Sequence, residues 1–241
     1  MRNRQVSIQK RIIFSVFAGI ACLFFFACGI PVYYVIEPPQ IEHVATYETT
    51  DIPERYFSFI CPYNSSTENS EFTLLGTDIY YRIYNNLDDM NADVSSISSR
   101  NTEYSDSGYR RMIELDYQQL WLASGASPVV RKTSAVRTVE LRLNTDTGYS
   151  SRLYDLTNET LISYPLRRGT GSTGSGNMTF DFTSNYYPEK NDSDVKIREG
   201  YNNEGAWYVN LYAVTVGRDV SLASQYSSLL HLGNLKIVQT Q

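Results

Sequence analysis

Several short motifs carry residue types that could bind an ion or a nucleotide or support catalysis. The range 89–93 holds two aspartates and an asparagine in alternation, which is the spacing of oxygen ligands in a calcium-binding loop. Such a loop needs glycine at position six and glutamate at position twelve, where this chain has Val94 and Arg100. We therefore expect solvated loop acids here and at Asp192 and Asp194, with a weak calcium site as the alternative.

Two further motifs match catalytic or phosphate-binding loops only in part. Gly169, Gly171 and Gly174 have the spacing of a dinucleotide-binding loop, which needs a helix after it so that the helix N-terminus faces the phosphates. Residues 178–182 instead alternate as in a strand, which indicates a hairpin connection. Asp146-Thr147-Gly148 matches one loop of the aspartic peptidases, but those enzymes need two such loops, so a β-turn is expected.

The two histidines of the chain, His43 and His231, are too few for a multi-histidine metal site. His43 lies in a proline-rich segment. His231 lies between Leu230 and Leu232, so its side chain is expected on the opposite face of a strand, toward solvent or a sheet edge. No catalytic residue, no cofactor and no metal ligand is therefore predicted.

Cys28 is the side chain with the clearest expected chemistry. A basic lead in residues 2–11 precedes an uncharged apolar run, residues 12–27, which is the pattern of a secretory signal. With Ala27 before the cysteine and Gly29 after it, the arrangement resembles a bacterial lipoprotein signal. The resemblance implies that Cys28 becomes the acylated first residue of an exported, membrane-anchored chain.

The segment departs from that pattern at Phe25 and Phe26, where a leucine and a small residue are usual, and Cys22 is a second candidate with a shorter apolar run. An uncleaved anchor is the first alternative, because the uncharged run continues to Ile36 and its 25 residues exceed the roughly 20 that span a bilayer. Pro31 argues against that anchor. A plainly cleaved signal is the second alternative.

Composition limits the partners and the redox chemistry. Loss of the four basic residues of the lead leaves 17 basic against 26 acidic residues, a net charge of −9 that would repel nucleic acid. Of the three cysteines, Cys61 alone would keep a free thiol. Because Cys61 alternates with Phe57 and Phe59, we expect a buried apolar residue rather than a reactive one.

Hydrophobic periodicity predicts a mainly β protein. Alternating apolar residues predict strands at 57–61, 79–83, 139–143 and 230–238, a first strand near Pro38-Pro39, and shorter strands near Leu153, 161–166, 178–182 and 195–197. The run 207–216 is apolar on both faces and should lie in the middle of a sheet. Spacings of three and four favour a helix over 108–121, and residues 86–107 are expected to be a loop or a short helix start.

Two of these strands carry a resemblance to a known family. Residues 76–84 (GTDIYYRIY) resemble the third strand of a fibronectin type III-like domain, and residues 207–214 (WYVNLYAV) resemble its sixth. Such domains recur in uncharacterised lipoproteins of spirochaetes, which have similarly relaxed signals and Tyr-rich strands. The resemblance implies a fibronectin type III-like or Ig-like β-sandwich.

The interval between the two strands is much longer than in that family, which predicts a long insertion. The expected organisation is a hydrophobic signal helix at 1–27, a lipidated cysteine and Pro-rich tether at 28–53, and a β-sandwich at 54–241. An insertion at about 88–200 would hold extra strands and one short helix. Two β-domains in tandem are the alternative.

The expected function is a non-catalytic lipoprotein module of the cell envelope, placed at the outer membrane or the periplasmic face. It would contact the membrane through its N-terminal lipid and serve a structural role or bind a protein or glycan, for which the 20 tyrosines offer contact surface. The alternatives are an envelope enzyme and the solute-binding component of a transporter.

Overall fold

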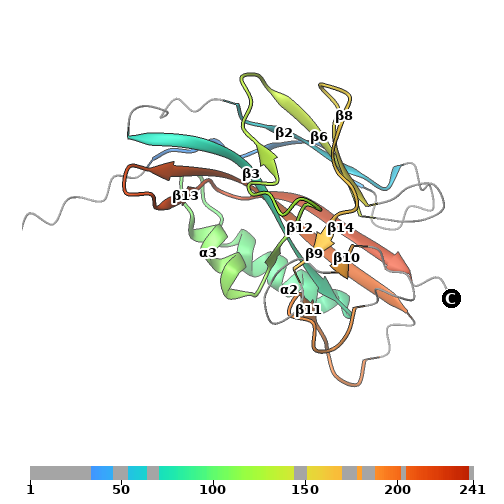
Figure 1. Cartoon of the computed structure of the whole chain (residues 1–241). Helices are drawn as coiled ribbons and strands as arrows, with labels where there is room; N and C mark the ends of the chain where they lie inside the picture. The colour runs from blue at the N-terminus through green and yellow to red at the C-terminus, as the bar shows by residue number, and fades with distance from the viewer. Residues whose placement is uncertain are drawn as a thin grey trace, which may run out of the picture. The chain divides into compact units, whose positions relative to one another are not determined.

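Two long antiparallel strands, β3 (Phe72–Tyr84) and β12 (Ala206–Asp219), form the centre of the computed structural model (Figure 1). The structure describes residues 34–45, 54–63, 71–143, 151–169, 178–180, 188–201 and 205–238. All of them belong to one unit, residues 34–241.

The β12 strand lies between β3 and a pair of strands on its other side, β13 (Ser224–Tyr226) and β14 (Leu230–Val238). The expected central position of this strand is confirmed. Its apolar residues are buried on both faces because both faces are covered. The far edge of β3 pairs with three short strands: β4 (Gln118–Gln119), β5 (Val130–Arg131) and the parallel strand β11 (Val195–Lys196).

A second, five-stranded sheet packs on one face of this sheet. Its order is β1 (Gln40–His43), β2 (Phe57–Cys61), β6 (Arg137–Arg142), β7 (Arg152–Asp155) and β8 (Thr160–Ser163), with all neighbours antiparallel. The inward side chains of both sheets form one core, which includes Phe57, Phe59, Ile79, Tyr81, Val139, Leu141, Val209 and Leu211. A separate two-stranded sheet pairs β9 (Arg167–Arg168) with β10 (Met178–Thr179).

Two helices, α2 (Leu87–Ser98) and α3 (Ser107–Glu114), cover the opposite face of the central sheet (Figure 1). Their apolar side chains Met90, Ile97 and Met112 are fully buried against tyrosines of that face. Asn86 caps α2 because its side chain accepts a hydrogen bond from the Asp89 backbone nitrogen at 3.1 Å. The described part of the chain therefore has three layers and is mainly β.

The two helix predictions were only partly right. The range 86–107 forms a complete helix over Leu87–Ser98, where a loop or a short start was expected. The helix expected over 108–121 ends at Glu114, and Asp116 has the positive φ of 56° that stops it. The apolar residues after it are buried by pairing with β3 instead, since the Leu120 nitrogen donates to the Ile79 carbonyl at 2.8 Å.

Most predicted strands are present, including the closing strand over Leu230–Val238. Cys61 is buried at the end of β2 and free, as expected. Strand β6 lies within 88–200 and pairs with β2 of the five-stranded sheet. The signal segment 1–27 and Cys28 lie outside the described residues. Within the part of the chain that is described, no helix is both long and apolar enough to cross a membrane.

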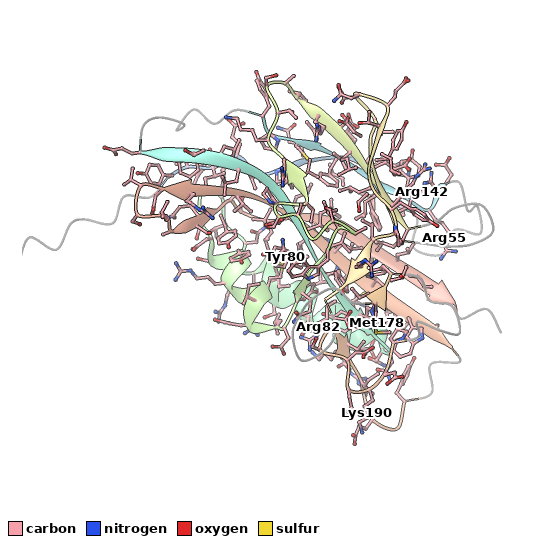
Figure 2. All side chains as sticks on the ribbon, in the orientation of Figure 1. Arg55, Tyr80, Arg82, Arg142, Met178 and Lys190 are labelled. Carbon is pink, nitrogen blue, oxygen red and sulfur yellow. The ribbon has the colours of Figure 1, made fainter. Side chains whose placement is uncertain are left out.

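The outer edge of β14 is partly blocked by a side chain. Arg55 Nη2, from the segment before β2, donates to the Lys236 carbonyl oxygen of β14 at 2.7 Å, and Arg55 is labelled in Figure 2. An edge strand with free backbone groups invites pairing with another chain. This contact occupies one of those groups.

Candidate ligand-binding site

A network of hydrogen-bonded polar side chains crosses the layer between the central sheet and the two helices. At one end, Lys196 Nζ of β11 donates to both carboxylate oxygens of Asp93 on α2 at 2.9 Å. Tyr84 Oη of β3 donates to Asp93 Oδ2 at 3.0 Å. Asp93 and Tyr84 are buried, which removes water from the carboxylate. The Lys196 ammonium and the Tyr84 hydroxyl replace that water as hydrogen-bond donors.

The hydrogen-bond network continues through a second tyrosine to β12. The single hydroxyl proton of Tyr84 is shared between Asp93 Oδ2 and Tyr117 Oη, which lies 3.1 Å from Tyr84 Oη, and Tyr117 Oη donates to Asn210 Oδ1 at 2.6 Å. Burial raises the pKa of both phenols well above the usual value, so both stay protonated and able to donate. Asn210 is fully buried in the middle of β12.

Asn210 extends the hydrogen-bond network to β14. Because its oxygen accepts from Tyr117, its amide nitrogen faces β14, where it donates to His231 Nε2 at 2.6 Å and to Asn234 Oδ1. His231 Nε2 is therefore an acceptor, and the ring proton sits on Nδ1. Desolvation of the ring lowers the pKa of His231 below its usual value, so the imidazole is neutral at pH 7.

The backbone of β14 explains why these side chains meet. The β12–β14 register shifts between Leu211 and Tyr212, which sets His231 opposite Tyr212. Gly233 has a φ of +130°, and a Cβ there would lie 2.9 Å from Val44 Cγ1. Glycine at this position lets the strand lie close to the neighbouring segment.

A surface pocket of about 470 Å³ lies at this edge of the sheet. Its lining comes from the 44–45 segment, from α2 and from β14: Val44, Ala45, Leu87, Asn91, His231, Leu232, Gly233 and Asn234. Among the described residues that line the pocket none is charged, and the polar ones are two amides and a neutral imidazole. The His231 ring also packs on Tyr212, with 4.8 Å between ring centroids.

The hydrogen-bond network behind the pocket determines which polar groups of the lining can bind a ligand. His231 Nε2 and Asn234 Oδ1 accept from Asn210, so the donors of this pair are His231 Nδ1–H and the Asn234 amide nitrogen, and His231 and Asn234 also share a side-chain hydrogen bond. Asn91 is exposed on α2 and contributes a second amide. A pocket whose described lining is neutral and combines donors with apolar groups suits a ligand that presents hydroxyl or carbonyl oxygens.

A second polar cluster lies between the sheets and is structural. Arg168 and Asp194 are fully buried, with Arg168 Nη2 2.7 Å from Asp194 Oδ1 and Arg168 Nε 2.9 Å from Asp194 Oδ2. Tyr81 Oη donates to Asp194 Oδ2 at 2.6 Å and accepts from the Gly169 nitrogen at 2.7 Å. Asp192 also accepts from Arg168 at 2.9 Å. These carboxylates balance a buried guanidinium, so they do not form a calcium site.

The structure also places the acids of the 89–93 motif away from any loop. Asp89 lies on α2 and pairs with Arg198 Nη2 at 2.5 Å, while Asp93 pairs with Lys196. Among the described side chains, no group of three or more His, Cys, Asp and Glu could hold a metal ion. The calcium alternative is therefore not supported there, because both carboxylates already have cationic partners.

The remaining predicted positions are dispersed. His231 is exposed on the edge strand β14, as predicted, whereas its hydrogen bond to Asn210 was not foreseen. His43 stacks on Tyr56 at 4.1 Å between centroids, on the other sheet. Asp146-Thr147-Gly148, the glycines 171 and 174, and Cys28 lie outside the described residues.

One residue in the sequence signals the site, although hydrophobic periodicity does not reveal it. Asn210 is a polar residue in the middle of a strand that is otherwise apolar on both faces. A buried amide there requires hydrogen-bond partners on neighbouring elements, so it marks a polar network.

Comparison with known proteins found no matching family, no matching curated protein and no matching solved structure.

Proposed function

We propose that this protein is an exported, membrane-anchored and non-catalytic module of the cell envelope that binds a neutral, oxygen-rich ligand. The leading class of ligand is a glycan, and a protein segment is the alternative. The observation that carries the proposal is the donor-lined pocket of β14 and α2. Its neutral polar groups are held in fixed orientation by the hydrogen-bond network that runs from Lys196 to His231. Preorganised donors reduce the ordering cost of binding.

The anchoring part rests on the N-terminal residues. The basic lead, the apolar run 12–27 and the Ala27-Cys28-Gly29 junction favour acylation at Cys28, with an uncleaved signal anchor as the alternative. Stable attachment needs more than one acyl chain, which a lipoprotein signal supplies. The module would then sit at the outer membrane or the periplasmic face.

A fibronectin type III-like sandwich is the proposed fold type. In immunoglobulin-type sandwiches the third, sixth and seventh strands are neighbours in one sheet, and the first, second and fifth belong to the other. The arrangement supports this assignment, since β3, β12 and β14 are neighbours in one sheet and β1, β2 and β6 in the other. The resembling segments 76–84 and 207–214 lie on β3 and β12.

The non-catalytic part is supported by the character of the pocket. An acid–base enzyme needs a group that can exchange a proton with substrate, but no carboxylate is among the described lining residues. The single imidazole there is held by the Asn210 amide rather than by a nucleophile or an acid. Solute-binding components are usually built of βα units, whereas the described sheets are linked mainly by β connections.

Labelled palmitate tests the anchoring. The wild-type chain should incorporate label, and Cys28→Ala should abolish it while Cys22→Ala leaves it unchanged. Absence of label in the wild type would remove lipidation, and label that survives Cys28→Ala would remove the assigned residue.

A glycan array probed with the full-length protein in lipid nanodiscs tests the pocket. Asn91→Ala removes an exposed amide with little effect on the fold, and loss of about 1 kcal/mol of hydrogen bonding weakens binding about fivefold. Ser95→Ala, also exposed on α2 but outside the pocket lining, is the matched control and should bind as wild type. Failure to bind any glycan, or equal binding by Asn91→Ala, contradicts the proposal.

A further inference from the structure

The turn between β12 and β13, residues 219–223, presents the two most exposed large apolar side chains of the described chain. Val220 is 68% exposed and Leu222 is 73% exposed. Single exposed apolar residues are common on soluble proteins. Two of them at the tip of one turn form a small apolar projection.

The turn is rigidly built. Asp219 Oδ1 accepts hydrogen bonds from the Ser221 nitrogen at 2.9 Å and from the Ala223 nitrogen at 3.0 Å, and the Asp219 nitrogen donates to the Ala223 carbonyl at 3.1 Å. These bonds fix the direction in which Val220 and Leu222 point. The projection is therefore preorganised rather than formed on contact.

Leu222 is an unexpected residue for its backbone conformation. Its φ is +67°, in the left-handed region that glycine and asparagine adopt at much lower cost than leucine. The leucine side chain gains nothing from burial within the described structure, because it is largely exposed. Strain retained at an exposed apolar residue points to a contact outside the domain.

The turn lies at the end of the central sheet where the described chain begins. The Val220 nitrogen donates to the Glu71 carbonyl at 3.1 Å, and Phe72 next to it stacks on Tyr34 with 4.8 Å between ring centroids. Figure 1 shows the β12–β13 turn beside the start of β3. Tyr34 is the first described residue, so the chain leaves toward its N-terminal segment from this end.

Tyr34 lies only six positions after Cys28, and a fully extended chain of that length spans about 20 Å. We propose that the 219–223 turn inserts Val220 and Leu222 into the interface of the membrane to which the chain is anchored, and so fixes the orientation of the domain. The inference rests on the proposed anchoring, and it holds for a lipid at Cys28 and for an uncleaved anchor alike. Apolar side chains next to an anchor add to membrane attachment by burial.

Site-directed nitroxide labelling of the full chain in phosphatidylethanolamine/phosphatidylglycerol vesicles tests the proposal. Leu222→Cys and, as a second variant, Val220→Cys carry the label, and Leu161→Cys is the matched control because Leu161 is 55% exposed on β8. Native Cys61 is buried and does not compete for the reagent, and Cys22 and Cys28, which keep their thiols in an uncleaved anchor, are replaced by serine if that anchor is found. Collision with apolar oxygen and with a water-soluble nickel chelate reports the surroundings of each label.

On vesicles that float with bound protein, the labels at 222 and 220 should lose access to nickel and gain access to oxygen, while the label at 161 stays accessible to nickel. Floating protein with labels at 222 and 220 that remain open to nickel overturns the insertion but leaves anchoring intact. Loss of nickel access without a gain in oxygen access also overturns it, because a protein partner or a second copy then covers the turn. Protein that does not float removes both proposals.

Discussion

Asp78 provides a test of how burial controls stability in the central sheet. This aspartate lies on β3 with 5% of its surface exposed, and its Oδ1 accepts hydrogen bonds from the Val129 nitrogen at 3.0 Å and from Gln119 Nε2 at 2.8 Å. Both donors are neutral, and none of the ion pairs among the described residues involves this carboxylate. Burial consequently raises the pKa of Asp78 from 3.8 to about 6.

The direction of the pH effect follows from this pKa. The folded chain holds the Asp78 proton more tightly than the unfolded chain. The contribution of Asp78 to the free energy of unfolding therefore falls as pH rises from about 4 to about 6 and is level above that. A difference of about two pKa units corresponds to about 3 kcal/mol. Asp78→Asn keeps the Oδ1 acceptor and removes the charge, so the variant should be more stable than wild type by up to about 3 kcal/mol at pH 7.

Urea unfolding of wild type and Asp78→Asn between pH 4 and pH 7.5 measures the effect. The stability difference should be near zero at pH 4 and should grow through pH 6, since the other titrating groups are common to both proteins. Asp88→Asn is the control because that side chain is 81% exposed, and its difference from wild type should not follow this curve. A pH-independent difference for Asp78→Asn would refute the assignment of a buried, raised carboxyl.

Three further predictions concern packing and chemistry elsewhere in the fold. Arg168→Met should cost about 3–5 kcal/mol in urea unfolding because it leaves Asp194 buried without its cation, and a cost below 1 kcal/mol would contradict this. Gly233→Ala should destabilise by about 1–3 kcal/mol, more than Gly200→Ala, because only the first meets neighbouring atoms; equal costs would show that the close approach is unimportant. The Cys61 thiol, whose pKa burial raises to about 12, should resist iodoacetamide at pH 8 in the native protein and react in urea. Fast native alkylation would place this thiol at the surface.

The strands were predictable because their signal is local. Alternation of apolar residues over 79–83, 139–143 and 230–238 is contained within each segment and survives in the structure as a buried face. The continuous apolar run of β12 likewise predicted its central position. These features depend on which side chains must leave water, and sequence spacing records that directly.

The full length of the helix at 87–98 was not predicted because its apolar signal is weak. Only Met90 and Ile97 are buried apolar residues on α2, and the remaining positions are mostly polar. The Asn86 cap and the acidic first turn stabilise the start of the helix, and contact with the central sheet provides the remainder.

The candidate site could not be predicted because its residues come from distant parts of the chain. Lys196 and Asp93 are 103 residues apart in sequence, and Tyr117 and Asn210 are 93 apart. Their meeting depends on the pairing of β3 with β12 and on the position of α2, neither of which leaves a mark in local spacing. The edge position of His231 was predictable, but its hydrogen-bonding partner was not.

The tautomer of His231 is the measurement that tests the account of the pocket most directly. Nitrogen-15 NMR of the imidazole groups, with His43→Gln to assign the two histidines, distinguishes the Nδ1–H form, the Nε2–H form and the imidazolium. We predict a neutral ring at pH 7 with its proton on Nδ1, because Asn210 donates to Nε2. A ring protonated on Nε2, in either the neutral or the charged form, would contradict the donor-lined pocket on which the proposed function rests.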